Sequence, residues 1–398
     1  MPTRICPYCY TPFDLRDVLY RCANPQCVIQ HDDALSAHWG DSRDLHPIAR
    51  AKKKMFGGVT NYGICPECKK ETYKVICPHC HNQVPAHMVE EGGKIISIIG
   101  AQSSGKTVFV SILIEELMRY GYTLGDIGVM ASTIADKEDE STQYRYNEDL
   151  YGPIYRYNSL PSATPREQGK KRPPFIFELC KRGQPSVFLV FYDNAGENFH
   201  DVKSMGNDAK YLIHSDAFIY LIDVLQIRDV NKRLNIPNFV EHNFDFGFVG
   251  NTIIEYCHSD DGRANADILN KPMAIVLNKF DNIYNHADMF GMSSVPGIGS
   301  NRSDSIFKLP GAQGAKRSDF DQVHAGIEYF LRTQCVEAHG NNFINNVQGN
   351  FKNYKFFGTS PLGGEPVDGA IANLNPFRVL DPLVWSLDKV GYKFNISD

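Results

Sequence analysis

The amino-acid sequence predicts an α/β fold, with a mostly parallel sheet flanked by helices and large insertions, preceded by a small cysteine-rich module. Two observations lead to this prediction. From about residue 92 onward, short apolar runs rich in Val, Ile and Phe precede turn residues and helical stretches, as parallel strands do. Eight of the eleven cysteines lie in the first fifth of the chain, arranged in close pairs. We therefore expect a module over residues 1–90 and a larger domain over residues 91–398.

The composition is that of an ordinary globular protein, with 42% hydrophobic residues, 22% charged residues and a net charge of −5. No apolar run approaches the roughly 18–20 residues of a membrane-spanning helix, and the start of the sequence lacks the apolar region of a signal peptide. We expect a cytoplasmic protein with no membrane association. The balanced charge does not favour an electrostatic nucleic-acid clamp.

Four cysteine pairs predict two zinc sites, because closely spaced thiols in a reducing compartment indicate metal ligands and two pairs complete a tetrahedral Cys₄ shell. The eight expected ligands are Cys6, Cys9, Cys22, Cys27, Cys65, Cys68, Cys77 and Cys80. The simplest assignment follows chain order, with residues 6–27 holding one Zn²⁺ and residues 65–80 holding the second, although the sequence does not fix the pairing. In the first site a thiol could be replaced by His31, His38 or His81.

A complete Cys₄ shell leaves no open coordination position, so we expect these metals to fold the module or to support a binding surface rather than to catalyse a reaction. The basic run of this region, Arg50 with residues 52–54, is more typical of a solvated face than of a phosphate site. Protein partners are therefore the main expectation, and nucleic acid is the weaker alternative.

A phosphate-binding loop follows the first predicted strand of the larger domain. Residues 94–99 form a short apolar run, and residues 100–107 read Gly-Ala-Gln-Ser-Ser-Gly-Lys-Thr, which is GxxxxGK[ST]. A helical stretch comes next, with an apolar face of Val110, Leu113, Ile114 and Leu117 and a stop at Gly121. Backbone N–H groups of such a loop surround phosphates, Lys106 reaches the β and γ oxygens, and Thr107 ligates Mg²⁺. The expected phosphate-binding residues are Gly100, Ser103, Ser104, Gly105, Lys106, Thr107 and Val108.

A second motif, Asp193-Asn-Ala-Gly196, ends the buried-strand run of residues 186–192. We expect Asp193 to hold Mg²⁺. Gly196 can bring its backbone N–H to a γ-phosphate without a side chain in the way, so this loop can distinguish a nucleoside triphosphate from a diphosphate.

Two further strand runs, at residues 217–222 and 273–277, precede the motif Asn278-Lys279-Phe280-Asp281. A carboxylate at Asp281 can accept hydrogen bonds from N1–H and the exocyclic amine of guanine, a donor pair that adenine lacks. A last strand at residues 354–357 leads into a loop with Ser360, Pro361 and Leu362, which resembles the base-contacting loop of GTPases. The expected base-binding residues are Asn278, Lys279, Asp281, Ser360, Pro361 and Leu362.

The ordered set GAQSSGKT, DNAG, NKFD and TSPL resembles the translation-factor-related class of P-loop GTPases, from about residue 92 to the end. With the cysteine pairs in front, the chain resembles the bacterial double-GTPase families with N-terminal zinc ribbons. The resemblance implies a GTPase that binds GTP/GDP and Mg²⁺, hydrolyses GTP to GDP and phosphate, and switches interactions with protein partners in a conflict or defence system. It also implies a switch threonine, for which Thr164 is the candidate. The expected catalytic residues are Lys106, Thr164, Gly196 and Glu197.

Two departures from the family pattern matter. Glu197 stands where many small GTPases place the Gln that orients the attacking water, so hydrolysis is expected to be slow or assisted. The alternative is that Glu197 is a solvent-facing residue at the start of a helix. Pro361 stands where the family has an Ala whose N–H contacts guanine, and proline has no N–H. Either Leu362 donates instead, or selectivity rests more on Asp281.

The function favoured by these residues is a regulatory GTPase. The alternative is a GTP-bound scaffold with little hydrolysis, which uses the zinc ribbons as its binding surface. A nucleic-acid-dependent ATPase is disfavoured by the NKFD motif and by the balanced charge.

Overall fold

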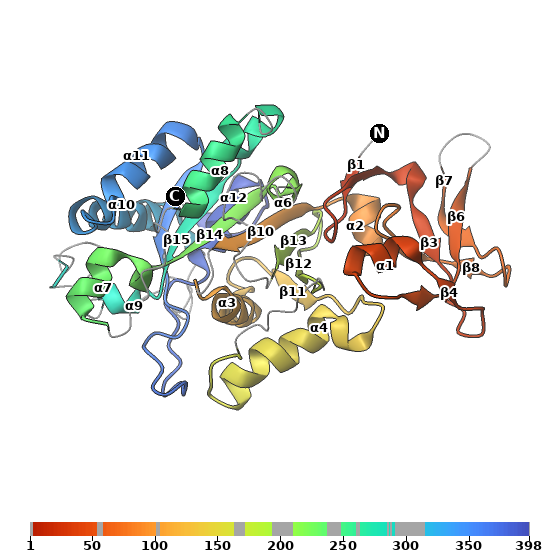
Figure 1. Cartoon of the computed structure of the whole chain (residues 1–398), viewed down its shortest axis with the longest axis horizontal. Coiled ribbons are helices and arrows are strands. Elements are labelled where there is room, and N and C mark those ends of the chain that lie inside the picture. The colour runs from red at the N-terminus through yellow and green to blue at the C-terminus, as the bar shows by residue number, and fades with distance from the viewer. Residues whose placement is uncertain are drawn as a thin grey trace.

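The computed structural model contains a central twisted sheet with helices on both sides and the cysteine-rich module at one end (Figure 1). The structure describes residues 3–53, 59–100, 104–162, 172–192, 210–236, 248–259, 263–284, 286, 289–290 and 315–397.

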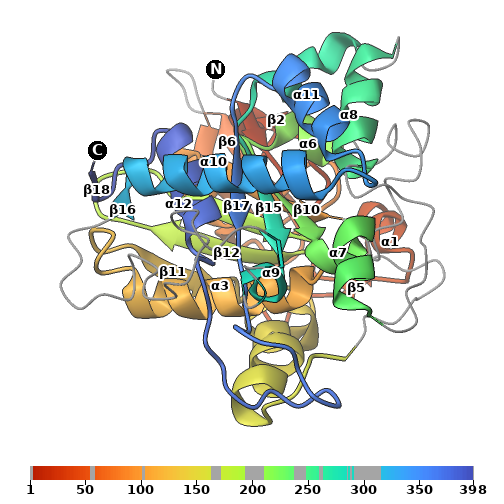
Figure 2. The same ribbon diagram turned by 90° about the vertical axis from the view of Figure 1, so that its left-hand side faces the viewer.

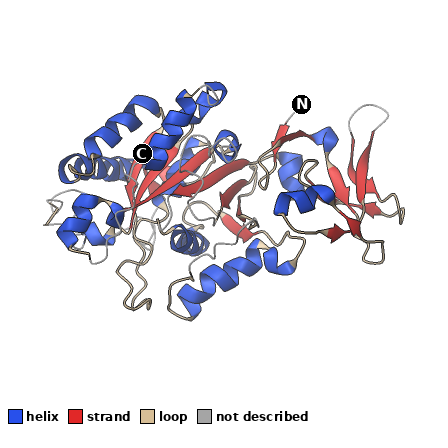
Figure 3. Ribbon diagram, in the orientation of Figure 1, coloured by secondary structure: helices blue, strands red, loops and turns tan. Residues whose placement is uncertain are grey.

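In the described part of the chain, the central sheet has seven strands (Figure 3). In spatial order they are β11 (Gly128–Ala131), β12 (Phe175–Cys180), β13 (Val187–Phe191), β10 (Lys94–Gly100), β14 (Ala217–Asp223), β15 (Met273–Asn278) and β17 (Tyr354–Gly358). The strands from β13 to β17 are parallel, whereas β11 and β12 run antiparallel at one edge. Every residue of β13, β14 and β15 is buried, as expected for strands covered on both faces. The predicted mostly parallel α/β fold is confirmed.

The helices lie on the two sides of this sheet. Figures 1 and 2 both place α3 on one side and α8, α10 and α11 on the other. The α-helices are α3 (Lys106–Tyr120), α4 (Thr142–Arg145), α6 (Lys210–His214), α7 (Arg228–Leu234), α8 (Phe248–His258), α9 (Asp281–Tyr284), α10 (Arg317–Gln334), α11 (Gly340–Asn350) and α12 (Asp381–Lys389). The other helical turns are a π-helix, η3 (Tyr146–Arg156), and the 3₁₀ segments η2 (Glu138–Glu140), η5 (Val224–Gln226) and η6 (Arg263–Asn270); β16 (Ala315–Lys316) and β18 (Ile396–Ser397) form a separate parallel pair.

Helix α3 has the apolar face that the sequence predicts. Val110, Leu113, Ile114 and Leu117 are all fully buried. The helix ends before Gly121, where a Cβ would lie 2.3 Å from the carbonyl oxygen of Ile127, so only glycine allows the chain to turn back this closely.

The long spacers between motifs contain regular structure. Residues 128–156 add an edge strand and the continuous helix α4–η3, and residues 317–350 add α10 and α11. The described parts of these insertions therefore consist largely of helices and an edge strand. None of the described helices is long and apolar enough to cross a membrane.

The cysteine-rich module is built from short antiparallel strands around a small core. Its elements are β1 (Thr3–Ile5), β2 (Pro12–Asp14), η1 (Leu15–Asp17), β3 (Leu19–Arg21), β4 (Gln30–His31), α1 (Asp33–Trp39), β5 (Asp44–Leu45), β6 (Ile48–Lys53), β7 (Val59–Ile64), β8 (Glu71–Thr72), β9 (Lys74–Ile76) and α2 (Ala86–Glu91). The order of its main sheet, within the described residues, is β8-β7-β6-β3-β9. Its core contains Phe13, Val18, Tyr20 and Val75 together with several cysteines. So small an apolar core is typical of a fold that a metal must stabilise.

The module packs directly against the central sheet. Ile95 of β10 and the alternate residues Phe188 and Val190 of β13 join Tyr10 and Met88 of the module in one buried cluster. Gly93, between α2 and β10, lies so close to this cluster that a Cβ there would be 2.6 Å from the Phe188 ring. The module therefore covers part of one face of the sheet.

Candidate nucleotide site and metal centres

The carboxyl ends of the parallel strands bring the described nucleotide motifs to one edge of the sheet. Gly100 ends β10 and pairs with Leu221 of β14, while Asn278 ends β15 opposite Asp223. The strand order places β10 between β13 and β14, so the chain leaves β10 at a point where connections go to both sides. Ligands of open α/β sheets bind in the crevice at such a point.

Two glycines of the GxxxxGKT motif are required by close contacts. Gly105 has φ of +80°, and a Cβ there would lie 2.7 Å from Nδ2 of Asn278. A Cβ on Gly100 would lie 2.7 Å from the carbonyl oxygen of Leu221. The two ends of the loop, Gly100 and Gly105, therefore lie against the neighbouring strand and against the NKFD motif.

Lys106 and Thr107 occupy the first turn of α3, where backbone N–H groups point along the helix axis toward an incoming anion. The ammonium group of Lys106 donates to the carbonyl oxygen of Gly100 at 2.8 Å, so it folds back over its own loop. Ser104 is almost fully buried, and its hydroxyl has no hydrogen-bond partner among the described residues. Val108 follows Thr107 in this half-buried first turn. A helix N-terminus, a lysine and a glycine loop form the donor set that suits phosphate.

Asn278 connects three loops. Its side chain is 1% exposed, donates from Nδ2 to the carbonyl oxygen of Ser104 at 2.9 Å, and accepts at Oδ1 from the Thr359 hydroxyl at 3.2 Å. The phosphate loop, the NKFD motif and the last loop are thus held together by one buried amide. Because both ends of the amide are used, Asn278 acts as a brace rather than as a direct ligand in this arrangement.

Lys279 and Asp281 lie on either side of Phe280 in the same motif. Lys279 has φ of +59°, and its ammonium forms a 2.6 Å ion pair with Asp223 at the end of β14. Asp281 accepts a 2.6 Å hydrogen bond from the Ser360 hydroxyl. Burial raises the pKa of Asp281, and the Ser360 hydrogen bond opposes that shift. A carboxylate fixed in this way has lone pairs left for two donors on one edge of guanine.

The loop after β17 supplies the remaining base contacts. The Ser360 hydroxyl accepts from the Gly363 N–H at 2.9 Å, so its own proton goes to Asp281. Pro361 is buried and offers no N–H. Within the described residues, the N–H of Leu362 has no hydrogen-bond partner. Leu362 is therefore the available backbone donor of this loop.

Several predicted residues lie outside the described part of the chain. They are Ser103, Thr164, Asp193, Gly196 and Glu197. Of the two predicted Mg²⁺ ligands, Thr107 is described and Asp193 is not.

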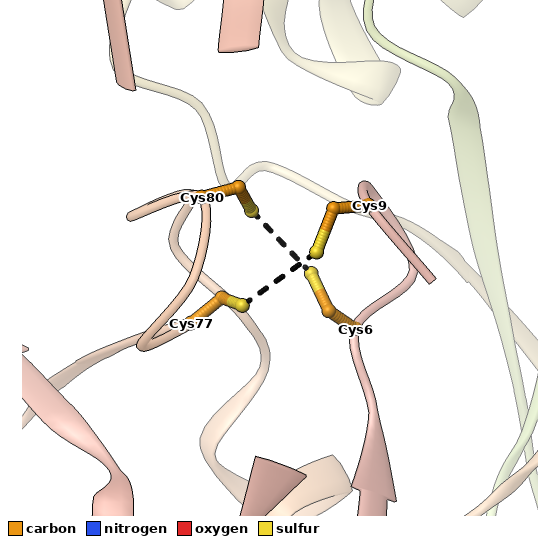
Figure 4. Close-up of side chains that lie close together, drawn as sticks. All are labelled: Cys6, Cys9, Cys77 and Cys80. Atoms are coloured by element: carbon orange, nitrogen blue, oxygen red, sulfur yellow. Dashed lines mark hydrogen bonds between the residues drawn. The ribbon is translucent and has the colours of Figure 1, made fainter. Parts of the chain in front are cut away.

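The cysteine sulfurs gather in two groups of four. The proximal site, next to the central sheet, contains Cys6, Cys9, Cys77 and Cys80 (Figure 4), and the distal site contains Cys22, Cys27, Cys65 and Cys68. Sulfur–sulfur distances are 3.7 Å and 3.8 Å across the proximal site and 3.6 Å and 3.8 Å across the distal site. A tetrahedral zinc with bonds of about 2.3 Å places its sulfurs about 3.8 Å apart. Both groups therefore fit Zn²⁺.

The chain-order pairing of the cysteines is wrong. The first pair joins the last, and the two middle pairs join each other. The reason is the antiparallel pairing of β3 with β9, in which Leu19 lies opposite Ile76 and Arg21 opposite Lys74. Cys22 follows β3 and Cys77 follows β9, so these two cysteines lie at opposite ends of the strand pair.

Three of the cysteine pairs share one turn geometry. The residue after the second cysteine, Tyr10, Lys69 or His81, has φ of 51°, 60° or 56° and donates its N–H to the carbonyl oxygen of the first cysteine. In the proximal site, the N–H groups of Tyr8 and His79 also lie 3.4 Å from a sulfur, which stabilises thiolate.

The histidines considered as replacement ligands have other contacts. His31 lies 2.9 Å from Asp44, His81 lies 2.7 Å from Asp32, and the His38 ring packs on Trp39. No histidine joins the two cysteine groups found among the described residues.

Residues 94–246 match the model of a protein family described as Double-GTPase 2. This segment starts with β10 and contains the phosphate loop and the DNAG motif. This segment is similar to the P-loop domains of that family. The GTPase fold expected from the motifs is thereby confirmed, and the cysteine groups suit the zinc ribbons expected in front of it.

A relative of the whole chain is known in Mycolicibacterium smegmatis. The two sequences are 21% identical over 97% of this chain and 99% of the relative, SaeC, whose name proposes a role in ESX-1 scaffolding and assembly.

Solved structures similar to the chain include the Arl6/BBS3 small GTPase of Trypanosoma brucei, with 12% identity, a TM-score of 0.29, and coverage of 75% of this chain and 97% of that one. The Ski7 GTPase-like domain of S. cerevisiae has 13% identity and a TM-score of 0.31, and the match covers 75% of this chain and 50% of that one. Elongation factor SelB of Methanococcus maripaludis has 12% identity and a TM-score of 0.26, and the match covers 74% of this chain and 34% of that one. These likenesses are remote, and the assignment rests on the family match and the motifs.

Two site residues of the GTPase domain were not predicted. Asp223 holds Lys279, and Thr359 holds Asn278. Asp223 could have been found, because a carboxylate directly after a buried strand lies at the carboxyl edge of a parallel sheet. Thr359 begins the predicted base-contacting loop, but its bond to Asn278 depends on the packing of two strands.

Proposed function

We propose that the chain is a guanine-nucleotide-dependent switch that hydrolyses GTP slowly and changes its contacts with protein partners. The observation that carries this proposal is the brace at Asn278, which joins the phosphate loop to the Asp281 loop and leaves the Asp281 carboxylate directed by Ser360. Mg²⁺ would be held by Thr107 and Asp193 and would neutralise charge on the phosphates.

The relative's name supports protein partners. SaeC is named for scaffolding and assembly, and it aligns with nearly the whole of this chain, zinc module included. We propose that residues 1–90 act as the partner-facing zinc module and residues 91–398 as the GTPase domain, working in the cytoplasm, where thiols stay reduced.

Single-turnover hydrolysis tests the enzymatic part. Bound radiolabelled GTP should be converted to GDP and phosphate by the wild-type chain. Lys106→Ala should show no conversion, because it loses the positive charge that holds the β and γ oxygens and therefore retains no GTP. GTP that stays intact on the wild-type chain over many hours would favour the second candidate.

That second candidate is a GTP-bound scaffold with little hydrolysis, which the relative's name also favours. Partner capture then depends on bound GTP but not on its cleavage. Equal capture of a partner in GTP and in a non-hydrolysable analogue supports the scaffold, whereas release upon hydrolysis supports the switch.

A further inference from the structure

The turn that carries the first two zinc ligands lies against the strand that leads into the DNAG motif. Tyr192 follows β13 directly and is joined to Asp193 by one peptide bond. Its hydroxyl donates to the carbonyl oxygen of Tyr8 at 2.8 Å and lies 3.2 Å from that of Pro7. Both carbonyls belong to the turn between Cys6 and Cys9, two ligands of the proximal site.

The same turn also contacts the strand that leads into the phosphate loop. Tyr10 is buried, its ring lies 6.1 Å from that of Tyr192, and its hydroxyl lies 3.4 Å from that of Ser97 on β10. Because β10 and β13 are adjacent and parallel, with Ile98 opposite Phe191, the turn touches both strands just before their functional loops begin.

A metal bound at the proximal site would tie this turn to the turn that carries Cys77 and Cys80. Cys6 and Cys9 belong to one end of the module and Cys77 and Cys80 to the other, so the metal fixes the distance between two segments far apart in sequence. Loss of the metal leaves four thiols without this constraint, and the Tyr8 carbonyl loses its fixed position.

The distal site offers an internal comparison. Its cysteines, Cys22, Cys27, Cys65 and Cys68, form a separate small cluster. Within the described residues, none of these four cysteines belongs to the cluster around Tyr10 and Tyr192.

We propose that Tyr192 is a positioning residue that couples the proximal metal site to the carboxyl end of β13, the strand that leads into the DNAG motif. Metal in the proximal site then favours Mg²⁺-dependent binding of guanine nucleotide, and metal in the distal site does so far less. This inference rests on the proposed guanine-nucleotide function.

The test uses the full chain, a fluorescent GTP analogue and a Mg²⁺ titration. Tyr192→Phe removes the hydroxyl bond to the turn, and a neutral hydrogen bond of about 0.5–1.5 kcal/mol corresponds to a shift of roughly 2–10-fold. The Mg²⁺ concentration for half-maximal binding should rise by that factor, while affinity measured in EDTA stays the same. A merely structural role would lower both affinities together or neither.

Tyr392→Phe is the matched control, because the buried Tyr392 also donates its hydroxyl to a backbone carbonyl, that of Leu179 on β12, away from the DNAG strand. It should bind Mg²⁺ and nucleotide as the wild type does. An unchanged Mg²⁺ requirement in Tyr192→Phe, or an equal shift in Tyr392→Phe, overturns the proposal.

The metal is tested by Cys9→Ser and Cys68→Ser, one half-buried ligand from each site. Zinc content by mass spectrometry should fall in both variants, and the Mg²⁺ requirement should rise more in Cys9→Ser than in Cys68→Ser. Equal shifts overturn the proposal, and the two tyrosine variants still decide it if Cys9→Ser fails to fold. A wild-type chain that binds no guanine nucleotide contradicts the proposed function itself, which separates the two failures.

Discussion

The nucleotide edge and the zinc module collect their residues by opposite strand arrangements. In the sheet from β13 to β17 every strand points the same way, so Gly100, Asp223, Asn278 and Thr359 all arrive at one edge, however long the insertions between them. In the module the strands alternate in direction, so cysteine pairs that are neighbours in sequence separate. Parallel strands gather a site in chain order, and antiparallel strands divide it.

The largest effect should come from pairs of cysteine substitutions that test this division. Cys6→Ser with Cys80→Ser removes two ligands from one site, so the chain should keep one zinc. Cys6→Ser with Cys27→Ser damages both sites and should lose both metals. Structural zinc binding is worth about 10–16 kcal/mol, so these losses are measurable by native mass spectrometry. Chain-order pairing would give the reverse result for the two doubles.

The next effect concerns the base. Asp281→Asn replaces an acceptor by an amide that can donate, so GDP affinity should fall about 10–100-fold, since hydrogen bonds to charged groups are worth about 1.5–3 kcal/mol. Xanthosine diphosphate, which carries a carbonyl where guanine has an amine, should bind better to this variant than GDP does. Calorimetry with both nucleotides measures the change, and an unchanged preference for GDP would contradict the role of Asp281.

The same carboxylate predicts a pH dependence. Burial raises the pKa of Asp281, so this carboxylate becomes protonated at a higher pH than an ordinary carboxyl does. GDP binding should therefore weaken as the pH falls through this raised pKa. Asp281→Asn has no such group and should lose this acid limb. An acid limb of equal midpoint in both proteins would assign it to another residue.

A smaller effect is expected from Gly105→Ala, which places a methyl 2.7 Å from Nδ2 of Asn278 and disturbs the brace between the loops. GDP affinity should fall, but by less than in Asp281→Asn. Gly183→Ala is the control, because Gly183 has φ of +85° with no atom near its missing Cβ, so the substitution costs about 1 kcal/mol of backbone strain without a clash. Similar GDP affinities in the two variants would show that the contact with Asn278 is unimportant.

The smallest effect lies between the module and the domain. Arg43 forms a two-pronged ion pair with Glu140, with N–O distances of 2.6 Å and 2.8 Å. Glu140→Gln should lower the free energy of unfolding by about 1 kcal/mol, whereas Glu148→Gln, in an exposed pair with Arg156, should have almost no effect. Denaturant unfolding of both variants measures the difference. Equal changes in the free energy of unfolding would show that the Arg43–Glu140 pair does not stabilise the interface.

The sequence predicted the parallel half of the chain well for a physical reason. Motifs that follow buried strands must meet at the carboxyl edge, so the contacts of Asn278 with Ser104 and of Asp281 with Ser360 connect loops that the sequence had already placed together. The edge strand β11 and the π-helix were not predicted, because both lie within an insertion whose structure depends on packing against α3 and β12.

The cysteine module was predicted in its ligands but not in its pairing. Spacing identifies Cys6-x-x-Cys9 as a turn that presents two sulfurs, yet the partner turn depends on which strands pair and in which direction. The packing of Tyr192 on the same turn had no sequence signal. Tyr192 and Tyr8 are 184 positions apart and come into contact only in the folded chain.

Native mass spectrometry of the purified full chain tests the central claim most directly. The account predicts a mass increase equal to one guanine nucleotide and two zinc ions, with the nucleotide lost and the zinc kept in Lys106→Ala. A chain that carries adenine nucleotide, or that carries no zinc under reducing conditions, would contradict it.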